Sequence, residues 1–163
     1  MAPDAASIPA LTGPRGYFED FAPGALMRHA RGKTIEPLEN VLITNMTLNT
    51  AAVHFDKALM KDTPSGRRVV YGGVTASLVV GLSSQDCSEK ALADLEITGL
   101  RLKSPVYHGD TIYAFSEVLE TAEADRADAG VVSFRHWGVN QDDVVVCEMV
   151  RRCLIRRRLG AEA

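Results

Sequence analysis

The stretch that decides the fold is NMTLNTAAVHFDKALMKDTPSGRRVVYGGVTASLVVGLSS, residues 45–84. In it, a polar turn carrying one histidine leads through a basic loop to a pair of glycines and an apolar segment. Between Val74 and Leu82, every face of a helical projection carries apolar or small residues, a pattern typical of a helix with no solvated side. The sequence therefore predicts a central helix that other elements bury on all sides.

Gly72 and Gly73 come just before this segment, where the first backbone N–H groups of a helix lack partners within it. Without a side chain, either glycine lets a ligand oxygen approach closely. The partial positive charge at a helix start favours a developing oxyanion, and an aimed amide contributes about 2.7 to 4 kcal/mol to a transition state. The pair is therefore a candidate oxyanion site, although it also suits close packing between the helix and a neighbouring strand.

Asn49 and His54 are candidate catalytic residues in the polar turn. They are five positions apart, whereas neighbours on one helix face are three or four apart, so they can converge only across a turn. Histidine can take and return a proton near neutral pH, which suits a general acid and base. Because His54 lies between Val53 and Phe55, a partly buried structural histidine is the competing interpretation.

Several segments together resemble one enzyme family. TLNTAAVHFD (47–56) followed by GRRVVYGGVTASL (66–78) resembles the MaoC-like dehydratases and (R)-specific enoyl-CoA hydratases of the hot-dog fold. Their motif Asp-x-Asn-Pro-x-His precedes the segment that opens the central helix. LRLKSPVYHGDTIY (100–113) is similar to the strand-turn-strand element of that family, and GYFEDFAPGALMRHARGKTI (16–35) to its itaconyl-CoA and mesaconyl-CoA hydratase branch. The resemblance covers residues 16–156.

The resemblance implies a role for each matching residue. It makes His54 the catalytic histidine and Gly72 the glycine whose amide binds the thioester oxygen. Asn49 stands where the family has its catalytic aspartate, which implies a histidine–asparagine version of the usual two-base arrangement. The other departures from the family pattern are Ala51 and Ala52, which replace the asparagine and proline of the motif, and Val80, which replaces a serine of the helix.

The family implies reversible addition of water to a 2-enoyl-CoA, possible substrates being short branched or dicarboxylic thioesters of the itaconyl-CoA and mesaconyl-CoA type. Two alternatives are a hot-dog acyl-CoA thioesterase and a non-catalytic acyl-CoA-binding subunit that has lost its aspartate. No cofactor is expected, since the CoA thioester is the substrate. Hot-dog sheets of this family commonly pair across subunits, which implies a homodimer or a larger homo-oligomer.

Four residues near the turn are candidates for substrate binding. Arg67 and Arg68 can grip a substrate carboxylate or a CoA phosphate in a two-pronged contact, or they can form a solvated loop edge. Tyr71, at a position where the family often has histidine, suits packing with a hydrogen-bonded hydroxyl. Asp56 can cap a short following helix or assist the catalytic histidine.

Composition limits the broad class. A chain of 163 residues suits one domain with a sizeable core, and we expect a flexible arm over 1–15 and a single domain over 16–158. Apolar and charged contents of 46% and 24% are typical of soluble globular proteins. A net charge of −3 indicates no nucleic-acid partner. With no signal-peptide pattern and no membrane-spanning apolar run, we expect a cytoplasmic protein that binds no membrane.

The cysteines indicate neither a disulfide framework nor a metal site. Cys87, Cys147 and Cys153 are odd in number and have no C-x-x-C or zinc spacing. They suit reduced core residues of a cytoplasmic protein. No histidine–carboxylate cluster has ligand spacing along the chain either, so the sequence predicts no metal.

The rest of the sequence predicts an α+β protein of the hot-dog type, a mostly antiparallel sheet wrapped around one long helix. A first strand is expected over 25–35 and a short helix over 36–47, since proline suits the first helical turn. Segments rich in Val, Ile, Phe and Tyr between turn signals predict strands at 94–103, 111–120, 129–140 and 144–156.

Five arginines close the last predicted strand. A run of like charges is usually a solvated face, which is the expectation here, and binding of CoA phosphates is the alternative. The residues are Arg151, Arg152, Arg156, Arg157 and Arg158.

Overall fold

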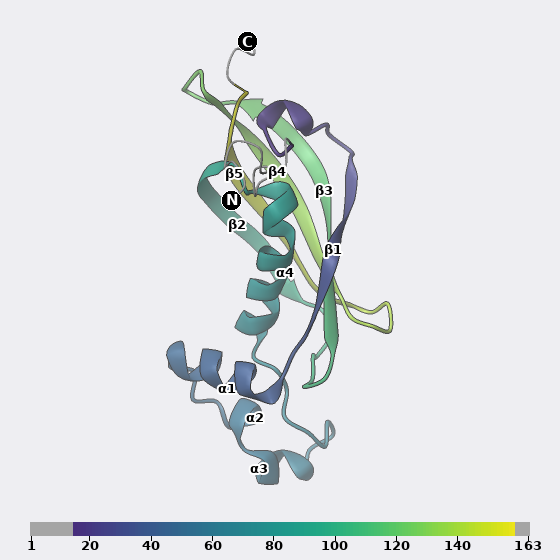
Figure 1. Cartoon of the computed structure of the whole chain (residues 1–163). Coiled ribbons are helices and arrows are strands. Elements are labelled where there is room, and N and C mark those ends of the chain that lie inside the picture. Colours follow the sequence, from purple (N-terminus) through teal and green to yellow (C-terminus); the bar gives the residue numbers. More distant parts are fainter. Residues whose placement is uncertain (1–14, 159–163) are drawn as a thin grey trace, which may run out of the picture.

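The computed structural model describes residues 15–158. Its strands are β1 (Leu26–Thr34), β2 (Ala91–Leu102), β3 (Thr111–Glu123), β4 (Ala129–Val139) and β5 (Val145–Arg156). Its helices are the 3-10 helix η2 (Phe18–Asp20) and the α-helices α1 (Pro37–Met46), α2 (Ala52–Phe55), α3 (Lys57–Lys61) and α4 (Gly72–Cys87). Figure 1 shows α4 lying along one face of the sheet and α1, α2 and α3 gathered beyond one end of it.

The five strands form one antiparallel sheet in the order β1-β3-β4-β5-β2. The first two strands of the chain are therefore its two edges. The predicted α+β class and the antiparallel sheet around one long helix are confirmed. All five predicted strands form, each within a few residues of its expected ends, because their apolar residues and turn signals are unambiguous.

The inner face of the sheet supplies the core under α4. Along β3, Ile112, Ala114, Ser116 and Val118 are buried while the residues between them are partly exposed, the period of two expected of a strand with one covered face. Ile112 and Ala114 pack in one apolar cluster with Val74 and Val79 of α4. Burial of these side chains holds the helix on the sheet.

The helix α4 is buried on one side rather than on all sides. Val74 and Val79 are buried, whereas Ser77 and Gly81 are exposed. The expectation of burial all round is wrong for this chain because the sheet covers one face of the helix, and no other layer within residues 15–158 covers the opposite face. The apolar pattern of α4 thus leaves a face of small residues uncovered.

The helix starts follow the local sequence. Glu36 is the N-cap of α1, where its N–H donates to the Glu39 carboxylate at 2.9 Å. Asp56 caps α3 by accepting from the Leu59 N–H at 2.8 Å. The arm expected over 1–15 lies, apart from Arg15, outside the described residues. Within them, no helix is long and apolar enough to cross a membrane.

Two arginines at the end of the chain are buried, which corrects the expectation of a solvated run. Arg151 is 3% exposed and donates to both carboxylate oxygens of Asp94, at 2.8 and 2.9 Å. Arg157 is 9% exposed and donates to Glu123 at 2.6 Å. Guanidinium groups are buried when they are paired, and the partners lie on β2 and at the end of β3, far from the arginines in sequence. The hydrogen bond from Arg151 also holds the pKa of Asp94 below its usual value.

One close approach of α4 to the sheet is at Gly138 of β4. A Cβ at this position would lie 2.5 Å from Cγ2 of Val79. A β-branched residue in a helix has almost no freedom to rotate away. The glycine therefore sets the distance between α4 and β4.

We predict that Gly138→Ala destabilises the fold by about 1 to 3 kcal/mol, as overpacking of a filled core does. Gly81→Ala is the matched control, because it adds the same methyl group to α4 where no atom lies within 4 Å. It should leave stability unchanged or raise it by about 0.5 to 1 kcal/mol. Urea unfolding measures both, and equal stability of the two variants would contradict the proposed close contact.

Candidate active site

His54 lies in α2, and its ring faces the segment that leads into α4. Its Nδ1 is 2.8 Å from the carbonyl oxygen of Val69. Because a carbonyl only accepts, Nδ1 must carry the proton, and in the neutral ring Nε2 then holds a lone pair. Within residues 15–158, Nε2 has no hydrogen-bond partner. The ring is therefore held in the tautomer that a general base needs.

The start of α4 lies beside this ring. The His54 and Tyr71 rings are 5.5 Å apart between centroids, and Tyr71 is the N-cap residue of α4. The first N–H groups to bond back to Tyr71 are those of Val74 and Thr75. The N–H groups of Gly72 and Gly73 have no partner in the described part of the chain, as expected for the first turn of a helix.

Packing also favours glycine at both positions. A Cβ on Gly72 would collide with Cδ1 of Leu102 in β2, and a Cβ on Gly73 would lie 2.5 Å from the ring of Tyr71. The two interpretations of the pair are compatible here. Because neither glycine has a side chain, the start of α4 packs closely against Leu102 and Tyr71, and its first N–H groups stay uncovered.

Asn40 of α1 joins the two halves of the site, a role that sequence reasoning missed. Its side chain is fully buried. Its Oδ1 accepts from the Tyr71 N–H at 2.9 Å, and its Nδ2 donates to the His54 carbonyl at 3.3 Å. The only signal in the sequence is a polar residue on the inner side of a predicted helix. Asn40 therefore fixes α2 relative to the start of α4.

Asn49 lies in the turn before α2. Its Oδ1 accepts from the Ala51 N–H at 3.1 Å, so this oxygen supports the turn, while its NH₂ group has no partner among residues 15–158. Asp56 has its Oδ1 engaged as the cap of α3, in agreement with the capping interpretation. These bonds leave the side-chain NH₂ group of Asn49 available as a hydrogen-bond donor.

Arg67 and Arg68 have different surroundings. The Arg67 guanidinium stacks over the Tyr107 ring at 3.7 Å, whereas Arg68 Nη1 lies 3.4 Å from the Phe55 carbonyl. Neither forms an ion pair with a carboxylate of the described chain. Burial, with a smaller effect of Arg68, lowers the pKa of His108. Two guanidinium charges, one of them beside α2, are thus available to an anion.

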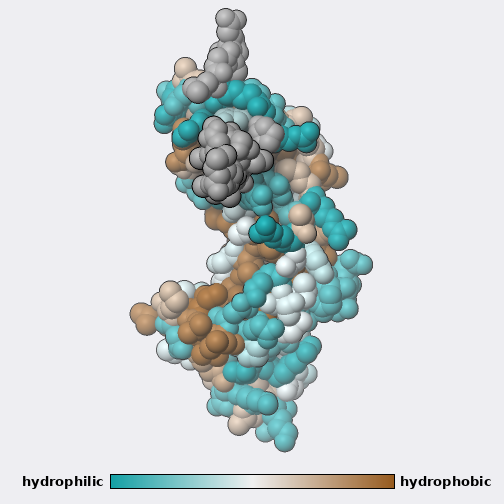
Figure 2. Space-filling view, in the orientation of Figure 1, coloured by the Kyte–Doolittle hydropathy of each residue, from teal (hydrophilic) through white to brown (hydrophobic). Residues whose placement is uncertain are grey.

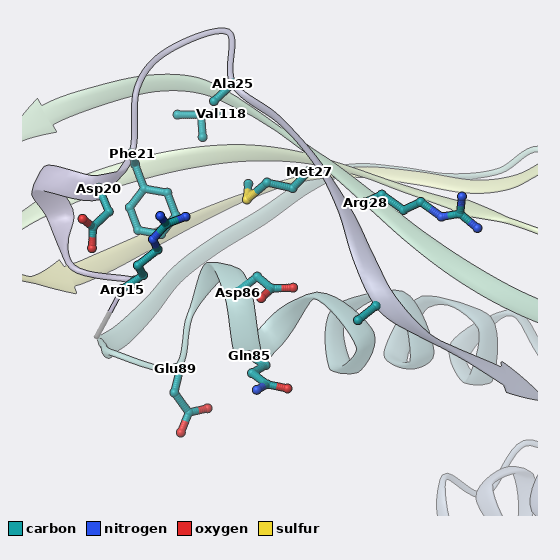
Figure 3. Close-up of a pocket in the computed structure, with 12 residues that line it drawn as sticks. Arg15, Asp20, Phe21, Ala25, Met27, Arg28, Gln85, Asp86, Glu89 and Val118 are labelled. Atoms are coloured by element: carbon teal, nitrogen blue, oxygen red, sulfur yellow. The ribbon is translucent and has the colours of Figure 1, made fainter. Parts of the chain in front are cut away.

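A cavity of about 630 Å³ lies at the opposite end of α4, between η2, β1 and the last helical turn, and Figure 3 shows Asp86 and Gln85 projecting there. A second, of about 590 Å³, lies beside Phe115 and Trp137. Neither lining includes His54 or Gly72. Within a single chain both residues are partly exposed.

Comparison with known proteins gives consistent matches. The family model for mesaconyl-CoA hydratase matches residues 10–157. The β-methylmalyl-CoA dehydratase of Chloroflexus aurantiacus is 37% identical over 127 residues, which are 77% of this chain and 36% of that protein. The mesaconyl-CoA hydratase of Haloarcula marismortui is 34% identical over 152 residues, 86% of this chain and 42% of that protein. This chain spans less than half the length of these curated relatives.

Solved structures agree on the fold. A MaoC domain protein dehydratase from Chloroflexus aurantiacus superposes with a TM-score of 0.82 at 31% identity, covering 88% of this chain and 45% of that chain. A Mycobacterium tuberculosis protein described as having a double hotdog fold superposes with a TM-score of 0.83 at 21% identity. The match covers 90% of this chain and 46% of that chain. At that identity the second match shows the fold alone, and the fold is the hot-dog fold.

We predict that Asn40→Ala lowers stability by about 1 to 3 kcal/mol, because it leaves the Tyr71 N–H and the His54 carbonyl without hydrogen-bond partners. Asn45→Ala is the control, since Asn45 is exposed on the same helix and such changes stay within about 0.5 kcal/mol. Urea unfolding gives the stabilities, and amide NMR shifts at residues 54 and 71 report the geometry. Unchanged shifts in Asn40→Ala would exclude the bridging role.

Proposed function

The chain belongs to the mesaconyl-CoA hydratase family, and from that premise we propose that it adds water reversibly across the double bond of a 2-enoyl-CoA thioester. The observation that carries this proposal is the free Nε2 of His54 beside the uncovered amides at the start of α4. A base and an oxyanion site are the two groups that this reaction needs. The matched relatives are named for mesaconyl-CoA and β-methylmalyl-CoA, which supports a short branched or dicarboxylic acyl group.

In the proposed reaction, Nε2 of His54 and the Asn49 amide hold a water against C3 of the substrate. The water oxygen bonds to C3 while its proton moves to Nε2. The electrons of the double bond shift toward the thioester carbonyl, whose oxygen lies at the Gly72 amide with Gly73 beside it. An aimed amide contributes about 2.7 to 4 kcal/mol to such an enolate-like transition state.

The second proton transfer returns the His54 proton to C2 and completes the addition. Asparagine cannot titrate, so Asn49 orients the water and the histidine acts as base and then as acid. Asp56 is a cap of α3, which leaves it a supporting role at most. No cofactor takes part in these steps.

We assign substrate binding to the basic loop and the helix start. Arg67 and Arg68 have no carboxylate partner within the described residues, and a guanidinium can grip a planar carboxylate or a phosphate. A dicarboxylic acyl group or CoA itself supplies such an anion. Tyr71 lies beside the His54 ring and directly precedes the two glycines.

The test is an assay of purified protein with crotonyl-, mesaconyl- and itaconyl-CoA. The readout is the change in substrate mass that corresponds to one water. Release of free CoA would instead support the thioesterase alternative. Tight binding without turnover would support the non-catalytic subunit.

We predict that His54→Ala lowers turnover by at least about tenfold, as loss of a general base does, while circular dichroism stays unchanged. Asn49→Asp restores the family residue and should keep the fold intact. Wild-type turnover in His54→Ala would remove this residue from the mechanism.

We also propose that the protein is a cytoplasmic homodimer. The three cysteines are free and buried, which suits a reducing compartment. The inner and outer sides of β2 are exposed and one edge of the strand is unpaired, the arrangement that pairs with another chain. The exposed apolar residues of β2 are Leu95, Ile97, Leu100 and Leu102, each about half exposed.

A second apolar surface supports association. Leu38, Leu42 and Met46 are 65%, 51% and 82% exposed and follow one face of α1. Figure 2 shows apolar residues gathered on the surface over the end of the molecule that holds α1. A second copy can cover this surface and enclose the candidate site.

We predict that Leu100→Glu on β2 weakens self-association at least about tenfold, because a buried carboxylate without a partner opposes docking. Leu26→Glu is the control, since Leu26 is 75% exposed on the other edge strand. Sedimentation equilibrium measures both. Equal dissociation constants for the two variants would show that β2 is not the interface.

A further inference from the structure

A buried polar cluster lies at the end of α4 opposite the candidate active site. It consists of His29 of β1, Cys87 at the last position of α4 and His136 of β4. The three residues are 2%, 0% and 0% exposed. One ring nitrogen of each histidine and the Cys87 Sγ all lie within 4.8 Å of one another. This grouping is independent of the residues proposed for hydration.

Hydrogen bonds orient both rings. Asp86 Oδ2 is 2.6 Å from His29 Nδ1, and Ser116 Oγ is 2.7 Å from His29 Nε2 and 2.6 Å from His136 Nδ1. The carboxylate only accepts, so His29 Nδ1 carries a proton and Nε2 of the neutral ring accepts from Ser116. In this arrangement the Ser116 proton is used, so His136 Nδ1–H donates to the Ser116 oxygen, and the Cys87 Sγ lies 4.0 Å from the same His29 Nε2.

These hydrogen bonds leave His136 Nε2 with a lone pair. That atom is buried and has no hydrogen-bond partner among residues 15–158. A buried nitrogen lone pair without a donor is unusual in a folded protein, and it is the form of histidine that binds metals.

We propose that His29, Cys87 and His136 form a buried binding site for a zinc-type divalent metal ion. Two imidazoles and one thiolate are a ligand set that Zn²⁺ uses. Asp86 on His29 Nδ1 supplies the carboxylate that typically orients a ligating histidine.

The charges of the site balance around a dication. The thiolate of Cys87 and the carboxylate of Asp86 together offset the two positive charges of the ion. The neighbouring Arg151 is already neutralised by Asp94, with hydrogen bonds of 2.8 and 2.9 Å. On binding, the S–H bond of Cys87 breaks as the sulfur–metal bond forms, and the proton is released to solvent.

Asp86 links the site to the surface. The Asp86 side chain is half exposed and lines the cavity shown in Figure 3, together with Met27 of β1. An ion entering there meets a carboxylate first and then His29. Because the ligands come from β1, α4 and β4, the bound ion would join the end of the helix to two strands, which makes it a structural ion.

The test titrates the purified chain, stripped of metal by a chelator, with Co²⁺ as the spectroscopic probe. We expect one Co²⁺ per chain with a near-ultraviolet thiolate-to-cobalt absorption, displaced by Zn²⁺. Cys87→Ala should lose this absorption and bind at least about tenfold more weakly. Cys147→Ala, which removes an equally buried thiol outside the cluster, should behave as wild type.

X-ray absorption of the zinc-treated wild-type chain reads the ligand set without any variant, so the test does not depend on the folding of Cys87→Ala. Two nitrogens and one sulfur around the ion would support the site. Absence of the thiolate absorption in the wild type, or a zinc shell without sulfur, would overturn the proposal and leave the cluster as a hydrogen-bond network only.

Discussion

The packing of α4 on the inner face of the sheet is the constraint on which the rest of the structure depends. Val79 meets β4 where Gly138 has no side chain, and this contact fixes the middle of the helix. Because an α-helix is stiff along its axis, fixing its middle also fixes both ends. The first end presents the amides of Gly72 and Gly73 toward His54, and the last end brings Cys87 beside the two buried histidines. Both proposed sites, one at each end of α4, thus depend on the close packing of the middle of the helix.

The strands and the start of α4 could be predicted from the sequence because their signals are local. Period-two apolar patterns and a glycine pair before an apolar run depend only on neighbours in the chain. The burial of Arg151 and the bridging by Asn40 could not be predicted, because their partners Asp94 and Tyr71 lie far away in sequence. The grouping of His29, Cys87 and His136 is missed for the same reason, since spacing along a chain says nothing about residues that meet across a sheet.

The candidate site combines residues that are predictable with orientations that are not. The family resemblance pointed to His54 and Gly72 as single positions. Only the Val69 carbonyl determines which nitrogen of the ring is free, and this group is a backbone atom that no motif records. The same holds for Asn49, whose oxygen supports the turn and whose NH₂ group remains available. An asparagine at position 49 therefore gives the turn a hydrogen-bond donor and no charge.

The strand order has a consequence for synthesis on the ribosome. β1 pairs with β3, and β2 pairs only with β5, the last strand to be made. While residues 103–144 are being translated, β2 and its leucines have no partner within the nascent chain. A strand whose partner lies far away in the sequence pairs late, and its apolar surface stays exposed until then. The growing polypeptide thus passes through a stage in which chaperones have a defined segment to protect.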